Sequence, residues 1–314
     1  MTLPTSRYTM ASFLDAESAH KYKNAEKATR PYVKTIVQQS GIAAYLETGA
    51  EANILDFACG TGVVAQEIYD TVPKEKWEQL KVLGTDISPP MLEHLRARGE
   101  TQGWKKLDTK IVDGNVSYPC LRTLQHWVDT NAFFQTDITQ ALPKASYTHV
   151  FVSFAISMLP AQILTHLCSL LRPGGYIAVA TWSSMSWDSL LTRSIALTNA
   201  PQPYSPSREE LREKFCGLWA DESYLAQQFE AVGLGRVGTS NEKKAVRVGT
   251  PDVFVGTMQF PLQYVRSTWW QGEREGILED LNGAMKGIVQ QEVGEDGEVE
   301  LVFDGIVGWG WKSG

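Results

Sequence analysis

The sequence predicts an α/β protein built on a doubly wound, mostly parallel β-sheet, with an N-terminal helical lid and a C-terminal helical cap. Short apolar segments typical of strands alternate with helical segments up to Trp182, one strand ends in a glycine-rich turn, and the alternation weakens after Trp182. We expect a lid at 1–48, a sheet-bearing core at 49–245 with a helical elaboration at about 184–232, and a cap with a closing strand of the same domain at 246–314.

The first elements follow from apolar spacing and turn residues. Apolar residues at helical spacing predict a helix over 11–47, which ends before Gly49. A short apolar strand at 53–58 leads into a glycine cluster, and helix resumes at 63–69. A second strand is expected at 81–86, and Ser88 is a suitable cap for the helix that follows, with two prolines in its first turn.

The second half repeats this pattern and then departs from it. We expect a strand at 147–154, a helix at about 160–171, a turn at 172–175 and a strand at 176–182. This alternation indicates parallel strands with right-handed crossovers. Later stretches predict helices and a closing strand or hairpin, as follows: helix at 207–218, 222–232 and 251–286, and strand or hairpin at 299–311.

Composition narrows the classes of function. The 314 residues carry a formal charge of -7, which argues against nucleic acid as the main partner, since phosphate binding favours a basic face. The four cysteines match neither a zinc site nor a dense disulfide framework, so no metal is expected and the compartment is expected to be reducing. With no signal peptide and no long apolar run, we expect a cytoplasmic protein without a membrane partner; a homodimer is compatible with the sequence.

The central motif is Asp56-Phe-Ala-Cys-Gly-Thr-Gly62, which ends a strand and begins a helix. Small residues at Ala58, Gly60 and Gly62, with Cys59 between them, let a ligand lie against the backbone beside the first amides of the helix. A dinucleotide-binding loop and an S-adenosylmethionine-binding loop both have this shape. The carboxylate of Asp56 favours the second, because it suits the ammonium of a methionyl group and would repel a pyrophosphate.

A second carboxylate, Asp86, ends the next strand. At that place it can accept hydrogen bonds from both ribose hydroxyls, as also happens in nicotinamide enzymes, or it can simply cap the following helix. Ile87 and Met91 would then line the adenine, although Met91 is equally well explained as helix-to-sheet core.

Four segments together resemble class I S-adenosylmethionine-dependent methyltransferases, which have a Rossmann-like fold. They are Asp56–Gly62, Gly84-Thr-Asp-Ile-Ser-Pro-Pro-Met-Leu92, Tyr147-Thr-His-Val-Phe-Val-Ser-Phe154 and Leu171-Arg-Pro-Gly-Gly-Tyr-Ile177. Three more make the chain similar to fungal secondary-metabolite methyltransferases such as the gliotoxin thiol methyltransferase: Ser12-Phe-Leu-Asp, Tyr22-Lys-Asn-Ala-Glu-Lys27 and Ala180-Thr-Trp182. Ala58 departs from the glycine that many members carry.

The resemblance implies further contacts. It adds Tyr22 and Phe154 to the cofactor-binding residues, and it implies an acidic or amide side chain against the adenine after the fourth strand. Asp113 is our preferred residue for that contact and Asp137 is its rival. Residues 116–135 between them have no counterpart in the resembling enzymes; they are either a surface insertion or a translated intron, whose codons could hold splice signals.

The substrate chamber is expected from Ile156, Ser157 and Met158 after one strand and from Trp182 and Trp187 after the next. Trp269 and Trp270 lie in the expected cap, and each of these tryptophans is as well explained by core packing.

Methyl transfer needs little beyond in-line positioning, so no catalytic residue is assigned, and His20 is the least unsuitable base among the five histidines. We expect transfer of a methyl group from S-adenosylmethionine to O, N or S of a hydrophobic small molecule in fungal secondary metabolism. Two alternatives are a methyltransferase-like protein that binds the cofactor but catalyses a rearrangement or cyclisation, and a nicotinamide oxidoreductase.

Overall fold

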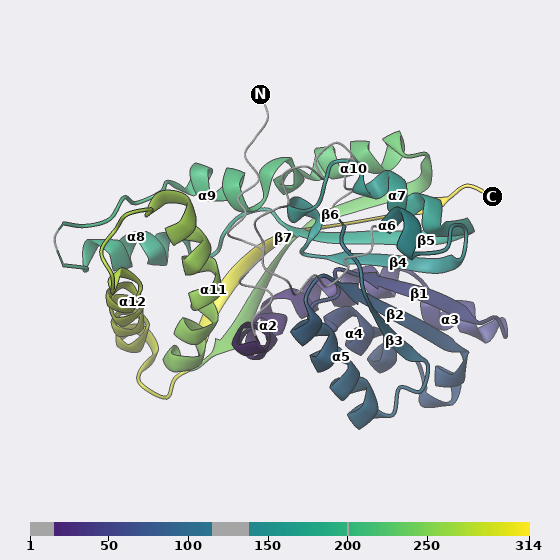
Figure 1. Cartoon of the computed structure of the whole chain (residues 1–314), viewed down its shortest axis with the longest axis horizontal. Helices are drawn as coiled ribbons and strands as arrows, with labels where there is room; N and C mark the ends of the chain where they lie inside the picture. Colours follow the sequence, from purple (N-terminus) through teal and green to yellow (C-terminus); the bar gives the residue numbers. More distant parts are fainter. Residues whose placement is uncertain (1–15, 115–137, 200) are drawn as a thin grey trace, which may run out of the picture.

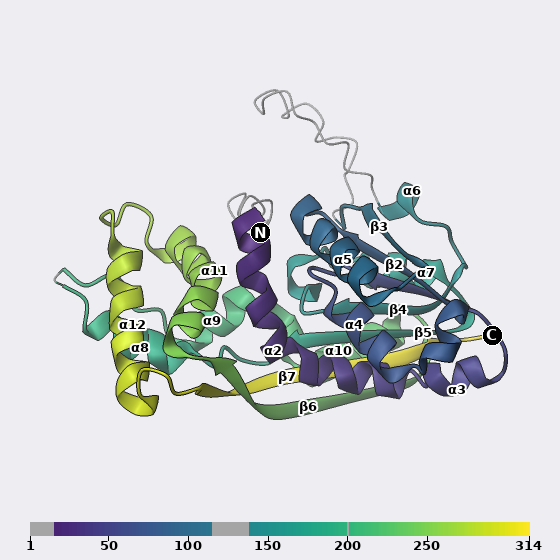
Figure 2. The same ribbon diagram turned by 90° about the horizontal axis from the view of Figure 1, so that it is seen from below.

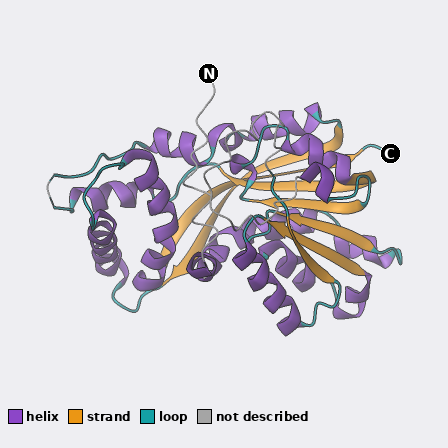
Figure 3. Cartoon of the chain, in the orientation of Figure 1, coloured by secondary structure: helices purple, strands orange, loops and turns teal. Residues whose placement is uncertain are grey.

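A seven-stranded sheet in the order β3-β2-β1-β4-β5-β7-β6 organises the protein (Figures 1 and 3). The computed structural model describes residues 16–114, 138–199 and 201–314. The strands from β3 to β5 are parallel, and β7 pairs antiparallel with both β5 and β6. The strands are β1 (Ala52–Phe57), β2 (Leu80–Asp86), β3 (Leu107–Ile111), β4 (Tyr147–Ser153), β5 (Leu171–Trp182), β6 (Leu234–Gly249) and β7 (Val299–Lys312). The predicted doubly wound, mostly parallel sheet is confirmed.

Helices cover both faces of the sheet because successive strand residues point to opposite sides. In β4, Phe151 packs into the core beneath α2 to α5, whereas Val150 and Val152 pack into the core beneath α6, α7 and α10. The helices are α2 (Ala16–Gln39), α3 (Ile42–Glu47), α4 (Val63–Thr71), α5 (Pro89–Gln102), α6 (Ile138–Ala141), α7 (Ile163–Leu170), α8 (Asp188–Ala196), α9 (Arg208–Phe215), α10 (Glu222–Ala231), α11 (Pro251–Trp269) and α12 (Ile277–Val293), with short 3-10 turns η1 (Lys74–Gln79), η3 (Ile156–Met158) and η4 (Gly217–Ala220).

Local sequence signals explain the helix that follows β2. The Ser88 hydroxyl accepts a hydrogen bond from the Met91 amide at 3.4 Å, and two prolines occupy the first turn, where an amide proton would have no helical partner. The helix ends at Gly103, which has a φ of 76°. The expected cap at Ser88 is therefore confirmed.

Three local expectations were wrong in detail. The helix expected over 11–47 is divided at Gly41, and the one expected over 251–286 is divided into α11 and α12. The turn at 172–175 lies inside β5 as an irregularity, because Tyr147 pairs with Leu171 and His149 with Tyr176. The closing segment is one long strand, which is one of the two forms expected, and it pairs with β6, a strand that was not expected.

The two antiparallel strands extend beyond the rest of the sheet. Trp182, the last residue of β5, pairs with Gly305, whereas the β6–β7 pairing continues as far as Gly249 and Val299. We call the paired strands β6 and β7 the ribbon. The ribbon passes the carboxyl end of β5; β6 leads into α11, and α12 leads into β7 (Figures 1 and 2). The expected boundary between residues 245 and 246 falls inside β6. The cap helices therefore lie at the carboxyl edge of the parallel strands, where ligands of such sheets bind.

Candidate cofactor and acceptor site

The site begins where β1 and β2 end side by side. Asp56 pairs with Gly84 across the two strands, and its side chain is fully buried. Asp86 closes β2 and accepts hydrogen bonds from the Gly60 amide and the Ser88 amide, each at 2.9 Å. The second carboxylate is therefore tied to the glycine loop, and the structure brings together Asp56, Gly60 and Asp86 as the sequence predicted.

The loop itself uses left-handed backbone conformations. Ala58, Gly60 and Gly62 have φ values of 54°, 52° and 90°. Such values suit glycine, because a side chain there contacts the neighbouring carbonyl. The alanine at position 58 thus occupies a conformation in which glycine would be less strained.

Glycine is required at position 62 for a reason other than the one we expected. A Cβ atom added there would lie 2.3 Å from Cδ1 of Leu95, and one added at Gly84 would lie 2.4 Å from Cδ2 of the same leucine. These two glycines let α5 pack closely against the loop and β2. Packing within the protein, rather than ligand approach alone, therefore requires the absence of a side chain at Gly62.

Asp56 is a buried carboxyl group whose charge is not satisfied by its surroundings. Among the described residues, no donor makes a hydrogen bond to either oxygen. Burial raises the pKa of Asp56 to about 8; the Ala65 amide at the start of α4 lowers it, and the neighbouring Asp86 raises it further. A cation brought to this carboxylate would favour its ionised form, so the ammonium of S-adenosylmethionine fits the site.

Asp86 is held in a similar environment but has partners. Burial raises its pKa, and the amides of Ser88, Gly60 and Ile87 oppose that change. An ionised carboxylate offers about four lone-pair sites, so both oxygens can accept a further hydrogen bond each. The group therefore fits two hydroxyls of a ribose.

Other predicted cofactor residues contribute differently. The Cys59 amide donates to the Thr85 carbonyl at 2.9 Å, and burial raises the pKa of its thiol well above the usual value. Met91 is buried and Ile87 is half-buried. Asp113 is half-buried. It follows β3, whose last residue Ile111 pairs with Asp86 of β2, so it lies after the third strand and not after the fourth as expected. It remains beside the carboxyl end of β2.

Several predictions fall outside what the structure describes. The side chains of His20 and Tyr22, the rival residue Asp137 and the segment 116–135 lie outside the described residues. The choice of Asp113 over Asp137 for the adenine contact therefore stays a prediction, and so does the origin of the segment 116–135.

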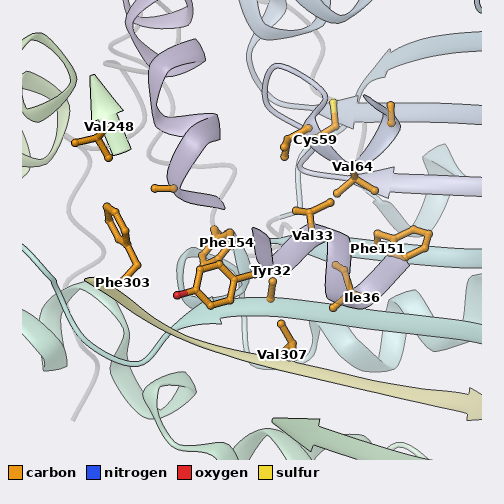
Figure 4. Packing of buried hydrophobic residues seen from close by; sticks show 14 of the residues in the cluster. Tyr32, Val33, Ile36, Cys59, Val64, Phe151, Phe154, Val248, Phe303 and Val307 are labelled. Atoms are coloured by element: carbon orange, nitrogen blue, oxygen red, sulfur yellow. The ribbon is translucent and has the colours of Figure 1, made fainter. Parts of the chain in front are cut away.

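Aromatic rings gather at the carboxyl ends of β4 and β5. Phe154, whose φ is 54°, lies 4.0 Å from Trp182 between ring centroids, and Tyr32 of α2 meets both rings edge-on at 5.6 Å. Phe303 of β7 lies 5.4 Å from Trp182. Figure 4 shows Tyr32, Phe154 and Phe303 close together between α2 and the ribbon. We call these four rings the aromatic cluster; Val248 belongs to the same hydrophobic core, and Leu301 packs against it.

The other residues expected to line the chamber have different surroundings. Ile156 is fully buried in the core beneath α7, and Met158 is 54% exposed. Trp187 is buried at the start of α8, with its ring edge-on to Phe215 at 5.4 Å. Of these residues, Trp182 alone lies in the aromatic cluster, and Ile156 and Trp187 contribute packing.

Two members of the cluster were not expected from the sequence. Tyr32 lies within the helix expected over 11–47, and Phe303 lies within the closing strand expected over 299–311. Neither position carried a local signal, because their proximity to Trp182 arises from the docking of α2 and β7. Trp270 is also structural: its indole donates to the Tyr204 carbonyl at 2.7 Å.

The buried histidine His149 has a structural environment. Burial lowers the pKa of His149 to about 4, and the nearby positive charge of Arg172 adds to this effect. Its Nδ1 lies 2.8 Å from the Thr148 hydroxyl. His94 and His166 lie on α5 and α7. Within the described ranges, no group of three or more His, Cys, Asp or Glu side chains could hold a metal ion. No helix in the described part of the chain is long and apolar enough to span a membrane.

Comparison with known proteins agrees with this geometry. A family model described as a methyltransferase domain matches residues 26–236. Methyltransferase tpcH of Aspergillus fumigatus is 26% identical over 303 residues, which cover 96% of this chain and 98% of that protein. Acetylaranotin bis-thiomethyltransferase of Aspergillus terreus is 24% identical over 270 residues, covering 84% and 83%. Phosphoethanolamine N-methyltransferase 2 of Haemonchus contortus, solved with S-adenosyl-L-methionine, aligns with a TM-score of 0.45 and 12% identity over 88% of this chain and 53% of that one.

Proposed function

The chain belongs to the methyltransferase domain family, and on that premise we propose that it transfers a methyl group to an O, N or S atom of a hydrophobic small molecule. It is an enzyme, and its cofactor is S-adenosylmethionine, as the sequence predicted. Similarity to methyltransferases from Aspergillus, one of them a bis-thiomethyltransferase, supports a role in fungal secondary metabolism.

The observation that carries the proposal is the buried, unpaired carboxyl group of Asp56 beside the glycine loop. Asp56 would hold the methionyl ammonium, Asp86 the ribose hydroxyls and Asp113 the adenine. When bound, the cofactor supplies a sulfonium-activated methyl group, which any well-placed nucleophile can accept. What remains for the protein is to orient the acceptor and to exclude water.

The aromatic cluster supports an apolar acceptor. It lies at the carboxyl ends of β4 and β5, next to the strand that carries Asp56. Trp182 is the half-buried member of the cluster, whereas the other three residues are buried. Rings of this kind bury a planar or aliphatic ligand with little loss of side-chain entropy.

The test is incubation of the protein with S-adenosylmethionine labelled in the methyl group and a panel of hydrophobic thiols, phenols and amines. Label in an acceptor, together with S-adenosylhomocysteine, would support the proposal and identify the atom. Cofactor that binds but transfers to no member of the panel would favour the rearrangement or cyclisation alternative. Asp56→Asn should abolish both binding and transfer. Homodimer formation and a cytoplasmic location stay predictions, which light scattering and localisation of the tagged protein would check.

A further inference from the structure

Helix α2 consists of two segments that meet at Pro31. Proline has no amide proton, so the helix loses the hydrogen bond to the carbonyl four residues earlier. Figure 2 shows α2 changing direction along its length, and Figure 4 shows the change just before Tyr32. The segment after the bend is fixed in the core: Tyr32, Val33 and Ile36 have no exposed surface. We call residues 24–30, before the bend, the lid segment.

A cluster of polar contacts joins the lid segment to the glycine loop. The Glu26 carboxylate accepts hydrogen bonds from Nη2 of Arg98 at 2.8 Å and 2.9 Å, and it also accepts one from the Thr61 hydroxyl. Nη1 of the same arginine donates to the Gly62 carbonyl at 3.4 Å. Glu26 thus contacts one loop residue directly and the next through Arg98 on α5.

These contacts are largely shielded from water. The side chains of Glu26 and Arg98 are 16% and 12% exposed, and Thr61 is buried. An ion pair in this setting is screened less than a surface pair, and its hydrogen bonds are charge-assisted. Loss of the carboxylate would leave the guanidinium and the Thr61 hydroxyl without their acceptor, which is costly for shielded groups.

The lid segment has a second attachment that does not touch the loop. Arg30 donates from Nε to Glu67 at 2.9 Å and from Nη2 to Asp70 at 2.5 Å, and both carboxylates belong to α4. Glu67 is buried, with its side chain 7% exposed. This pair also joins α2 to the core, so it provides a matched control.

The loop residues that Glu26 reaches are those whose conformation matters for the cofactor. Gly60, on one side of Thr61, holds Asp86 through its amide, and Gly62, on the other, begins α4. Both glycines have left-handed backbone conformations, so the loop has little intrinsic preference for its bound shape. An external contact at Thr61 and Gly62 therefore restricts the loop between the two points.

We propose that Glu26 is a positioning residue for cofactor binding, which holds the glycine loop in its binding conformation and joins it to the lid segment. The inference rests on the proposed function and adds a residue to that same site. If the competent loop conformation becomes a minor state, apparent affinity falls in proportion to its population. The expected effect therefore lies in the dissociation constant of the cofactor, not in the chemical step.

The test uses the full chain and measures binding of S-adenosylhomocysteine by titration calorimetry, together with the melting temperature. Glu26→Gln should weaken binding about tenfold, which corresponds to about 1.4 kcal/mol. Thr61→Val, which removes only the hydroxyl, should weaken it about threefold, because the hydrogen bond that joins the loop to Glu26 is lost. Glu67→Gln should lower the melting temperature by a similar amount and leave the affinity within about twofold.

The outcomes separate this inference from the proposed function. If the unmodified protein does not bind S-adenosylhomocysteine, the proposed function fails. If it binds and Glu26→Gln binds equally well, the function stands and the positioning role is overturned. Equal loss of affinity in Glu67→Gln would also overturn it, since a general loosening of α2 would then explain both. Should Glu26→Gln not fold, Thr61→Val decides: unchanged affinity refutes the inference.

Discussion

The buried carboxyl group of Asp56 makes the stability of the ligand-free protein depend on pH in a direction opposite to that of a salt-bridged aspartate. Its pKa is 3.8 when unperturbed and about 8 in the fold. Below pH 3.8 both states are protonated, and above pH 8 both are ionised. Between these values the folded state holds a proton that the unfolded state has lost, so the free energy of unfolding falls as pH rises.

The magnitude follows from the two pKa values. Each pH unit between 3.8 and 7 lowers the free energy of unfolding by about 1.4 kcal/mol. At pH 7 the ionisable group therefore lowers it by at most about 4 kcal/mol. Asp56→Asn removes this dependence but leaves a buried amide without partners, at a cost of about 1–3 kcal/mol. The variant should therefore be more stable than the unmodified protein by about 1–3 kcal/mol at pH 7, and this difference should disappear towards pH 5.

Urea unfolding of both proteins at pH 5, 6 and 7 measures the difference. Asp296→Asn, in the exposed loop between α12 and β7, is the matched control and should change nothing. On the proposal that the ammonium of S-adenosylhomocysteine binds at Asp56, binding at pH 7 should release most of a proton, measurable by calorimetry in buffers of different ionisation enthalpy. A stability difference that stays constant from pH 5 to pH 7, or binding without proton release, would refute the reasoning.

Three further predictions concern the loop and the aromatic cluster. Ala58→Gly should raise the free energy of unfolding by up to about 1 kcal/mol in urea, because relief of the left-handed strain exceeds the added chain entropy; a loss of stability would contradict this. Gly84→Ala should cost about 1–3 kcal/mol through its clash with Leu95, and Leu95→Ala should cost less in that background than in the unmodified chain, as a double-mutant cycle would measure. Trp182→Phe should raise the KM of the acceptor about tenfold without changing cofactor affinity, whereas Trp187→Phe should lower only the melting temperature; equal kinetic effects would contradict the assignment of the cluster.

Local signals were sufficient for the first strand, its loop and the next helix. The strand, the small residues and the helix start lie within a short stretch of chain, and each is decided by neighbours in sequence. The same holds for Ser88, whose cap depends on residues up to Met91. The positions of Asp56 and Asp86 at the ends of two successive strands suggested their roles, and the structure has both at adjacent strand ends.

Strand β6, and with it the pairing that forms the β6–β7 ribbon, could not be predicted from the sequence. Its strands are about 50 residues apart, with α11 and α12 between them, and β6 alternates half-buried with exposed side chains, so it lacks the continuous apolar run of a central strand. Antiparallel pairing over its whole length stabilises it, and that pairing exists only when β7 has returned to the sheet.

By itself the sequence determined the glycine loop and the two carboxylates beside it, because a strand, a tight turn and a helix cap are set by contacts between near neighbours. Only the tertiary structure decided what surrounds them: Leu95 behind Gly62, Glu26 beside Thr61, and Tyr32 and Phe303 beside Trp182. The physical reason is that each of these contacts joins elements whose separation along the chain exceeds the reach of local propensity, so it forms only when the sheet and α2 pack together.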